Sequence, residues 1–538
     1  MAIYLGSNKV RLQEYIDNTE VVTDAVRFID YDGEILHEYS KDEFLALSSM
    51  PSNPTHSGLV SQGWNWSLSD AKDYVNEKDY LNIGQMYITE SGDTEIDVEF
   101  PEGSVRLSPY LGIAVKNEVD IDWGDNSTHS IVTGTRLFNQ IRTQHTYSQP
   151  GNYTIKIHVN SGSFAFYGTY AYPLLNNNNS TNAYYNIIYS SKVKSIRIGE
   201  NCSIGYFAFN NCYSLNSITI PDGVTSIDGN AFQNCYSLKS ITIPDTVTSI
   251  GSSAFNSCYS LSSITIPSTV TSIGDNAFNG CYSIKIKILK YLKYINNFKE
   301  VIIPDSVTSI DNSAFQYCYS LKSITIPDGV TSIGTSSFNN CYSLNSVTIP
   351  DTVTLIGAYA FQNCYSLQSI TIPDTVTSID SYAFQNCYSL KPITIPDFVT
   401  SIEGGAFSGC YSLNSITIPE GVTYIDGNAF YNCYSLSSVT ISDSVNSIGN
   451  NAFEGCHSLS SITIPDSVTS IGNSAFSSCY GMKEIHLKST TPPSLSSTNV
   501  FLDNPSDCIF YVPQGTLSTY QSATNWSTYA SKMQEESN

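Results

Sequence analysis

Cysteine has the most reactive side chain in this sequence, and twelve of the fourteen cysteines recur at a fixed spacing. They are Cys212, Cys235, Cys258, Cys281, Cys318, Cys341, Cys364, Cys387, Cys410, Cys433, Cys456 and Cys479. The spacing is 23 residues within two groups, and the 37 residues between the groups equal one repeat plus an insertion of 14. Stacked strands would place neighbouring cysteines about 4.8 Å apart, beyond the usual Cβ separation of a disulfide, and a straight column does not converge on zinc. The pattern therefore predicts buried thiols with weak S–H hydrogen bonds, and no metal or cofactor.

A tyrosine follows nearly every one of these cysteines. The column comprises Tyr213, Tyr236, Tyr259, Tyr282, Tyr319, Tyr342, Tyr365, Tyr388, Tyr411, Tyr434 and Tyr480, with His457 at one position. A side chain that follows an inward cysteine should point outward. The column is therefore a candidate aromatic ridge for binding proteins or glycans, because tyrosine offers a large contact area at low entropic cost. The alternative is a ladder of rings that pack on one another and hold the turn.

Two polar columns follow the same period. Ser217 and Thr219, then Ser240 and Thr242, mark a strand face that is nearly uniform and uncharged. This face is a candidate site for a repetitive ligand such as a polysaccharide, although recent duplication also explains the uniformity. The second column is acidic and contains Asp222, Asp245, Asp305, Asp328, Asp351, Asp374, Asp397, Glu420, Asp443 and Asp466. Turn chemistry explains it, and recruitment of divalent cations or of a basic partner is the alternative.

The insertion breaks the uniformity of the repeats. Residues 284–300 read IKIKILKYLKYINNFKE and carry Lys285, Lys287, Lys290, Lys293 and Lys299 in an otherwise acidic chain. The apolar residues have helical spacing. The segment is either a projecting contact element or a duplication slip that a loop tolerates.

Catalysis finds no support in the sequence. The seven histidines are scattered, and neither a Gly-rich phosphate loop nor a nucleophile in a recognisable setting is present. Asp120, Asp122 and Asp125 are a candidate calcium site, for which a plain turn is the alternative. We therefore expect a protein that is not an enzyme.

The repeat itself explains how these columns are positioned. In residues 212–234, CYSLNSITIPDGVTSIDGNAFQN, the run from Ile218 to Ile220 alternates like a strand with one buried face, and Pro221 ends it. Residues 224–227 predict a second extended segment, and residues 230–234 turn the chain back. About eight inward side chains contribute on the order of 12–24 kcal/mol, less than the roughly 23–46 kcal/mol needed to order the backbone of one coil. A single coil therefore cannot fold alone, and the stacking of coils on one another must supply the missing stabilisation. About twelve stacked coils should form a rod roughly 55–60 Å long.

The pattern LxxIxIPxxVTSIxxxAFxxC resembles the 23-residue leucine-rich repeats of BspA-like bacterial surface proteins over about residues 196–490. This resemblance implies a mainly β, right-handed solenoid in residues 191–490. It also implies an extracellular, adhesive role toward host proteins, glycans or other cells.

The flanking regions predict further units. Residues 119–125 (VDIDWGD) and 145–155 (HTYSQPGNYTI) resemble the paired motifs of PKD-like β-sandwich domains, with Asn126 in place of a glycine. In that fold Trp123 would fill the core, and such domains act as stalks. We expect a small α+β module at 1–90, the PKD-like β-sandwich at 91–172, an Asn-rich linker at 173–190 and a C-terminal cap at 491–538. Residues 40–43 (SKDE) resemble a capping box at a helix start.

Composition limits the partners. A net charge of −23 argues against nucleic acid and anionic membranes. The sequence contains no run of 18 or more apolar residues, so we expect no membrane insertion. No conventional secretory signal is visible near the start. We expect a surface adhesin or receptor-binding protein outside the cell. A phage-tail or virion-associated receptor-binding protein and a structural spacer are the alternatives, and the oligomeric state is left open.

Overall fold

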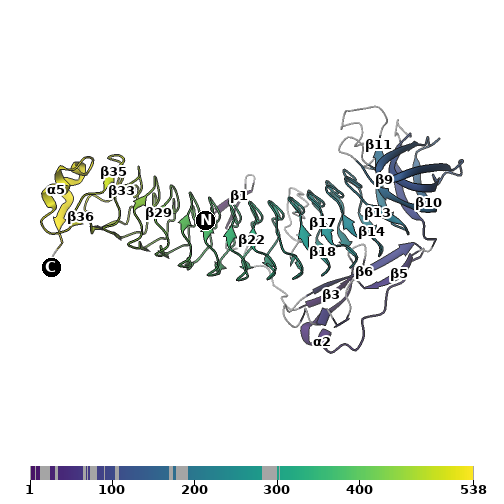
Figure 1. Cartoon of the computed structure of the whole chain (residues 1–538), viewed down its shortest axis with the longest axis horizontal. Coiled ribbons are helices and arrows are strands. Elements are labelled where there is room, and N and C mark those ends of the chain that lie inside the picture. The colour runs from purple at the N-terminus through teal and green to yellow at the C-terminus, as the bar shows by residue number, and fades with distance from the viewer. Residues whose placement is uncertain are drawn as a thin grey trace.

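Figure 1 shows the computed structural model of the chain as an elongated, gently arched rod with globular elements at both ends. The structure describes residues 2–5, 8–11, 25–30, 34–57, 59–64, 68–69, 71–72, 75, 81–89, 91–102, 108–168, 174–176, 192–281, 300–301 and 303–536. The rod is a β-solenoid of about 14 turns, so the mainly β class and the solenoid are confirmed. Counting cysteines gave about twelve turns, because the coils at the two ends lack a cysteine in register.

Most coils contribute one short strand to each of two parallel rows of strands, which we call the first and second ladders. The first ladder contains β12 (Val193–Arg197), β14 (Ser217–Thr219), β16 (Ser240–Thr242), β18 (Ser263–Thr265), β20 (Glu300–Val301), β21 (Ser323–Thr325), β23 (Ser346–Thr348), β25 (Ser369–Ile370), β28 (Ser415–Thr417), β30 (Ser438–Thr440), β32 (Ser461–Ile464) and β34 (Glu484–Leu487). The second ladder contains β13 (Cys202–Ile204), β15 (Ser226–Ile227), β17 (Ser249–Ile250), β19 (Ser272–Ile273), β22 (Ser332–Ile333), β24 (Leu355–Ile356), β26 (Ser378–Ile379), β27 (Ser401–Ile402), β29 (Tyr424–Ile425), β31 (Ser447–Ile448), β33 (Ser470–Ile471) and β35 (Ser494–Leu495). Paired residues are 23 apart along most of both ladders, as in Ser240↔Ser263 and Ser249↔Ser272. The sequence period is thus the length of one coil.

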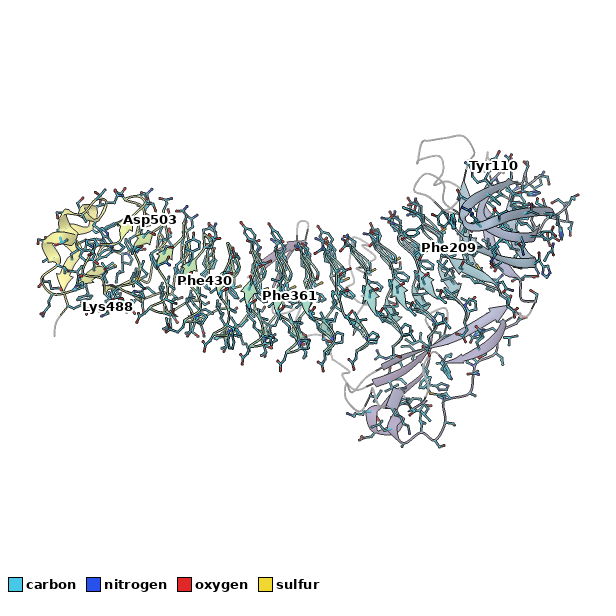
Figure 2. The ribbon with its side chains drawn as sticks, viewed as in Figure 1. Tyr110, Phe209, Phe361, Phe430, Lys488 and Asp503 are labelled. Carbon is cyan, nitrogen blue, oxygen red and sulfur yellow. The ribbon has the colours of Figure 1, made fainter. Side chains whose placement is uncertain are left out.

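The interior is built from columns of identical side chains. From Phe232 to Phe476 neighbouring phenylalanine rings lie 5.1–5.6 Å apart and within 10° of parallel. Figure 2 labels Phe361 and Phe430 of this column, and Phe209, whose ring is tilted by 34° against that of Phe232. Because each ring is covered by the rings of the adjacent coils, no single coil has a core of its own.

The cysteines lie beside this phenylalanine column as unpaired, buried thiols. From Cys235 to Cys479 each Sγ donates to the carbonyl oxygen of a phenylalanine in the preceding coil, at 3.2–3.4 Å. Burial raises the pKa of these thiols well above its ordinary value. The predicted S–H bonds are therefore present.

The insertion does not interrupt the stack. Phe278 and Phe315 stack at 5.3 Å across it, and the Cys318 thiol donates to the Phe278 carbonyl at 3.3 Å. Residues 282–299, with Lys287, Lys290 and Lys293, lie outside the described residues. The coils on the two sides therefore meet as if the insertion were absent.

A β-rich unit closes the N-terminal end of the solenoid. Its strands are β7 (Thr94–Phe100), β8 (Tyr110–Asp122), β9 (Ser130–Gln144), β10 (Gly151–Phe166) and β11 (Leu175–Asn176). Strand β7 pairs with β12 of the first ladder, and β10 pairs with β13 of the second. One sheet thus supplies the neighbour that the first strand of each ladder needs, and a single hydrophobic core runs from this unit into the solenoid.

The aromatic residues of this cap unit form its core. Trp123 is 1% exposed and stacks on His145 at 4.9 Å, while the Tyr147 hydroxyl donates to the Trp123 carbonyl. Tyr153 stacks on Tyr147 at 4.1 Å. The PKD-like identity of the unit stays a prediction, as does the linker, most of which lies outside the described residues.

A small module precedes the cap unit. It contains β3 (Ala25–Ile29), β4 (Ile35–Ser40), α2 (Lys41–Leu45), β5 (Leu59–Trp64) and β6 (Leu81–Thr89), in sheet order β4-β3-β6-β5. The Ser40 side chain and Glu43 form the predicted capping box. Further upstream, β1 (Ala2–Leu5) and β2 (Asn8–Arg11) pair as a hairpin.

The C-terminal end is also closed. Strands β36 (Ile509–Val512) and β37 (Met533–Glu535) extend the first ladder beyond β34, and α5 (Leu517–Ser522) with the 3-10 helix η1 (Trp526–Lys532) covers the last turn. Asn525 Nδ2 donates to the Leu495 carbonyl of the last second-ladder strand at 2.8 Å. Trp526 Nε1 donates to the Pro493 carbonyl at 2.7 Å. Both bonds occupy carbonyl groups that the final turn would otherwise expose.

Candidate functional site

The predicted Ser/Thr face is formed by the outward side chains of the first ladder, and its first coils are covered. Strand β6 of the N-terminal module lies against β14, β16 and β18 (Figure 1). Thr219, Ser240 and Thr242 are accordingly 3%, 4% and 9% exposed. For these three residues the expectation of an open face is wrong, because another part of the chain rests on them, while Ser217 is half-buried and its role stays a prediction.

The same face is open farther along the solenoid. Its exposed threonines are Thr348, Thr371, Thr394, Thr417, Thr440 and Thr463. Pro392 replaces the serine that begins the strand in neighbouring coils, and residues 392–394 form no strand. We call the part from β23 to β32 the free Ser/Thr face. It is uncharged and about six coils long.

The tyrosines form a ladder in which each ring covers the next. From Tyr319 through Tyr434 neighbouring rings lie 4.5–4.7 Å apart and within 10° of parallel, and His457 continues the stack from Tyr434 at 4.5 Å. Tyr213, Tyr236 and Tyr259 stack likewise at 4.5–4.6 Å. Burial and neighbouring hydroxyls raise the pKa of Tyr236 to about 12. The faces of the rings within each stack are therefore occupied, and a ligand there would meet ring edges and hydroxyl groups.

The acidic column lies at the exposed turns after the first-ladder strands. Within the described part of the chain, no group of three or more His, Cys, Asp or Glu residues is placed to hold a metal ion. Near the cap unit, Asp122 accepts from the Gly124 amide at 2.8 Å, and Asp125 accepts from the Ser127 amide and contacts His145. These carboxylates stabilise turns rather than converge, which favours the turn interpretation of the candidate calcium site.

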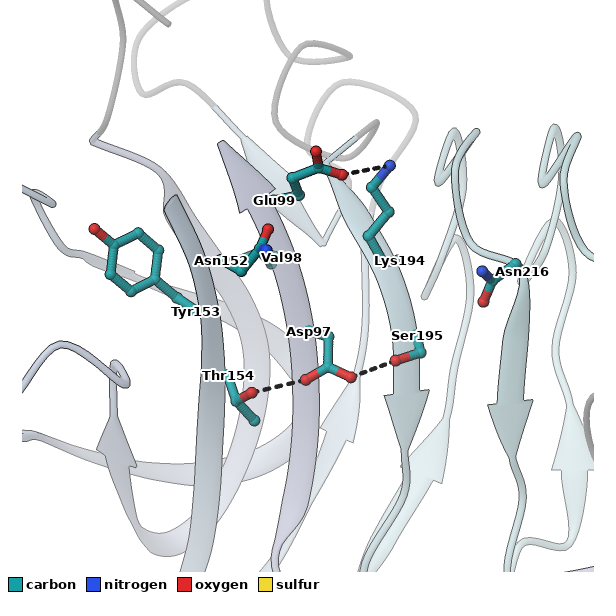
Figure 3. Close-up of a pocket in the computed structure, with 9 residues that line it drawn as sticks. All are labelled: Asp97, Val98, Glu99, Asn152, Tyr153, Thr154, Lys194, Ser195 and Asn216. Carbon is teal, nitrogen blue, oxygen red and sulfur yellow. Dashed lines mark hydrogen bonds and ion pairs between the residues drawn. The ribbon is translucent and has the colours of Figure 1, made fainter. Parts of the chain in front are cut away.

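A polar hollow of about 340 Å³ lies where the cap unit meets the first coil. Figure 3 shows Asp97 of β7 between Thr154 of β10 and Ser195 of β12, with both hydroxyls donating to its carboxylate. Arg197 adds two N–H bonds to Asp97, at 2.6 and 3.1 Å. Burial would raise the pKa of Asp97, but these donors outweigh it and hold the pKa below its usual range.

Sequence reasoning missed this cluster. The only signal was the alternation of buried and polar residues in residues 94–100 (TEIDVEF), which says that Asp97 faces outward but not which strand lies next to it. Glu99 pairs with Lys194 at 2.8 Å in the same hollow. Since its charges are paired internally, the hollow fastens the cap to the solenoid and has no unpaired charge for a ligand.

The sequence of the repeats decides the family. The family model of the BspA type leucine rich repeat region, which describes six copies of the repeat, matches residues 180–297, 287–414 and 400–502. The chain belongs to the BspA-type leucine-rich repeat family. Residues 180–502, more than half of the chain, carry these BspA-type repeats.

Several solved structures of bacterial proteins have similar repeats. A leucine-rich repeat protein from Bacteroides ovatus is 27% identical, with a TM-score of 0.39, over 64% of this chain and 95% of that one. A leucine rich cell surface protein from Faecalibacterium prausnitzii is 30% identical, with a TM-score of 0.37, over 62% of this chain and 92% of that one. No curated protein matches this chain. Among the described residues of this BspA-type protein, no helix is long and apolar enough to cross a bilayer.

Proposed function

We propose that this BspA-type protein is a non-enzymatic surface protein that binds a host protein, a glycan or another cell through its free Ser/Thr face. The observation that supports this proposal most is that hydroxyl side chains are buried at one end of this face and exposed farther along it. Hydroxyl side chains of the same type are covered by β6 at Thr219 and Thr242 and exposed at Thr417 and Thr440. The exposed stretch is a preformed row of donors and acceptors on a rigid scaffold, which lowers the entropy lost on binding.

A binding role also agrees with the rest of the chain. The solenoid is a scaffold of the kind that usually binds through an extended face. The cap unit and the C-terminal cap both end in hydrogen-bonded strands, so the long faces, and not the ends, are available. Among the described residues, no feature specifically favours the alternative of a virion protein.

The test is a glycan array and a matrix-protein array probed with the full chain. Thr417→Lys with Thr440→Lys places two cations on the free Ser/Thr face and should abolish binding to any hit. The matched control is Thr400→Lys with Thr423→Lys, since these exposed threonines lie outside the first ladder and should tolerate the change. Equal loss in both variants would refute the assignment of the face, and silence on both arrays would favour the structural spacer.

A further inference from the structure

Phe398 departs from the repeat at a position where most other coils have a small hydroxyl residue. One coil earlier, Thr375 occupies this position and donates from Oγ1 to the Val353 carbonyl at 2.7 Å. Phe398 has no hydroxyl to make the equivalent bond, and it is 68% exposed, the largest exposed fraction among the large apolar side chains in the described part of the chain. One coil later the equivalent position is Gly421, which has no side chain to cover the ring. An aromatic ring with this much exposed surface suits the anchor of a protein contact.

An acidic strip borders this ring. It consists of Asp374, Asp397 and Glu420, which are all exposed. The parallel registers Ser378↔Ser401 and Ile402↔Ile425 place the three carboxylates at equivalent points of adjacent coils, about 4.8 Å apart. Residues 303–481 contain thirteen acidic residues and two lysines, so little positive charge is available within the solenoid to offset the strip. A partner for this surface should combine cations with apolar side chains.

The chain itself contains a segment of that composition. Residues 282–299 contain five lysines and no acidic residue, and isoleucine, leucine, tyrosine and phenylalanine lie between the lysines. This concentration of positive charge stands out in a chain whose net charge is −23. Its charge is complementary to that of the acidic strip.

We propose that residues 282–299 of one copy dock on Phe398 and the acidic strip of a second copy. The lysines pair with the carboxylates, and the apolar side chains cover the exposed ring. Because the segment and the strip are different surfaces, each copy offers one of each, and the contact is head-to-tail. Such an interface gives open chains of copies, and added salt weakens it because its charges are exposed.

Sedimentation velocity of the full chain at low salt tests this proposal. The wild type should associate as its concentration rises to about 100 µM. Phe398→Thr introduces the residue that the preceding coil has at Thr375, so the variant should keep the fold and remain monomeric. Replacing Lys285, Lys287, Lys290 and Lys293 by Gln should have the same effect. An equimolar mixture of the two variants should form a 1:1 dimer, because one retains the segment and the other retains the strip.

The remaining outcomes overturn the proposal. A monomeric wild type, association by either variant alone, or a monomeric mixture would each do so.

Asp374→Asn with Asp397→Asn should weaken association about ten-fold. The matched control, Asp305→Asn with Asp328→Asn, removes the same charge from the same column away from Phe398, and an equal loss there would show general attraction instead. None of these measurements involves an external ligand, so a negative result leaves the proposed binding function intact.

Discussion

The backbone N–H of Asp222 donates to Oε1 of Gln62 at 3.2 Å, and this bond joins the solenoid to the N-terminal module. The two residues are 160 positions apart in the sequence. The contact lies at the turn that follows β14, next to the coils that β6 covers. The module is therefore packed on the solenoid and restricts which coils can meet a ligand.

Thr242→Lys should detach the module from the first coils. The residue is 9% exposed beneath β6, and an unpaired ammonium group there would lose its hydration. We expect a loss of about 2–4 kcal/mol at this contact. Hydrogen exchange should show faster exchange in residues 217–265 and in β6. Thr440→Lys, in the same column on the free face, should change stability by less than about 0.5 kcal/mol, and protection that is unchanged in Thr242→Lys would contradict the packing seen here.

The sequence predicted most of the solenoid because the solenoid is local and periodic. The strand at residues 217–219, the turn after Pro221 and the inward cysteines all follow from a 23-residue pattern of apolar residues. The pairing of coil with coil needs no further information, since each repeat meets a near copy of itself. The buried cysteines and the position of the insertion between two coils followed for the same reason.

The contacts that the sequence did not reveal join unlike segments. Nothing near Asp97 indicates that Arg197, 100 residues later, will bind it. Nothing in residues 81–89 indicates that β6 will cover Thr219. Such contacts depend on how two separately folded surfaces meet, and periodicity carries no information about that. The roles assigned to the tyrosines, the serines and threonines, and the insertion lysines remain predictions for the same reason.

The thiols of the cysteine column should be unreactive in the folded protein. Cys364 is fully buried, and burial raises its pKa, so the thiolate that would attack a reagent is suppressed. Incubation with a chromogenic disulfide at pH 8 should label almost none of the fourteen thiols until denaturant is added. Ser412→Cys, at an exposed position, is the positive control and should react at once. Rapid native labelling of the column would show that the coils are not closed.

Arg197→Ala should weaken the junction between the cap unit and the solenoid. The change removes two bonds to Asp97 and one of 2.9 Å to Glu95, and it leaves a half-buried carboxylate poorly paired. Because both side chains keep partial exposure, we expect a loss of about 1–3 kcal/mol in denaturant unfolding. Arg197→Lys keeps the charge without the two-pronged geometry and should lie between the wild type and Arg197→Ala.

The same pair should give the junction an acid-sensitive component. The folded pKa of Asp97 lies below its usual value, so ionised Asp97 stabilises the fold above about pH 4. That contribution is lost as the pH falls through the lowered pKa. Arg197→Ala should therefore lose less stability on acidification than the wild type, and parallel pH profiles would show that Asp97 does not depend on Arg197.

The tyrosine ladder should stabilise the coils through its rings and limit stability at high pH through its hydroxyls. Tyr411 stacks on Tyr388 at 4.5 Å and on Tyr434 at 4.6 Å, and burial with the neighbouring hydroxyls raises its pKa to about 12. For an acid with a raised folded pKa, the folded state is favoured at neutral pH and loses stability as the pH rises above the unfolded value of about 10. Tyr411→Phe keeps the stack and removes the proton, so it should be nearly neutral at pH 7 and should raise the alkaline unfolding midpoint. Tyr411→Ala should cost about 2–3 kcal/mol at pH 7. If both variants unfolded like the wild type at neutral and alkaline pH, the ladder would contribute nothing to stability. The repetition of tyrosine in nearly every coil would then need another cause, such as ligand contact at the ring edges.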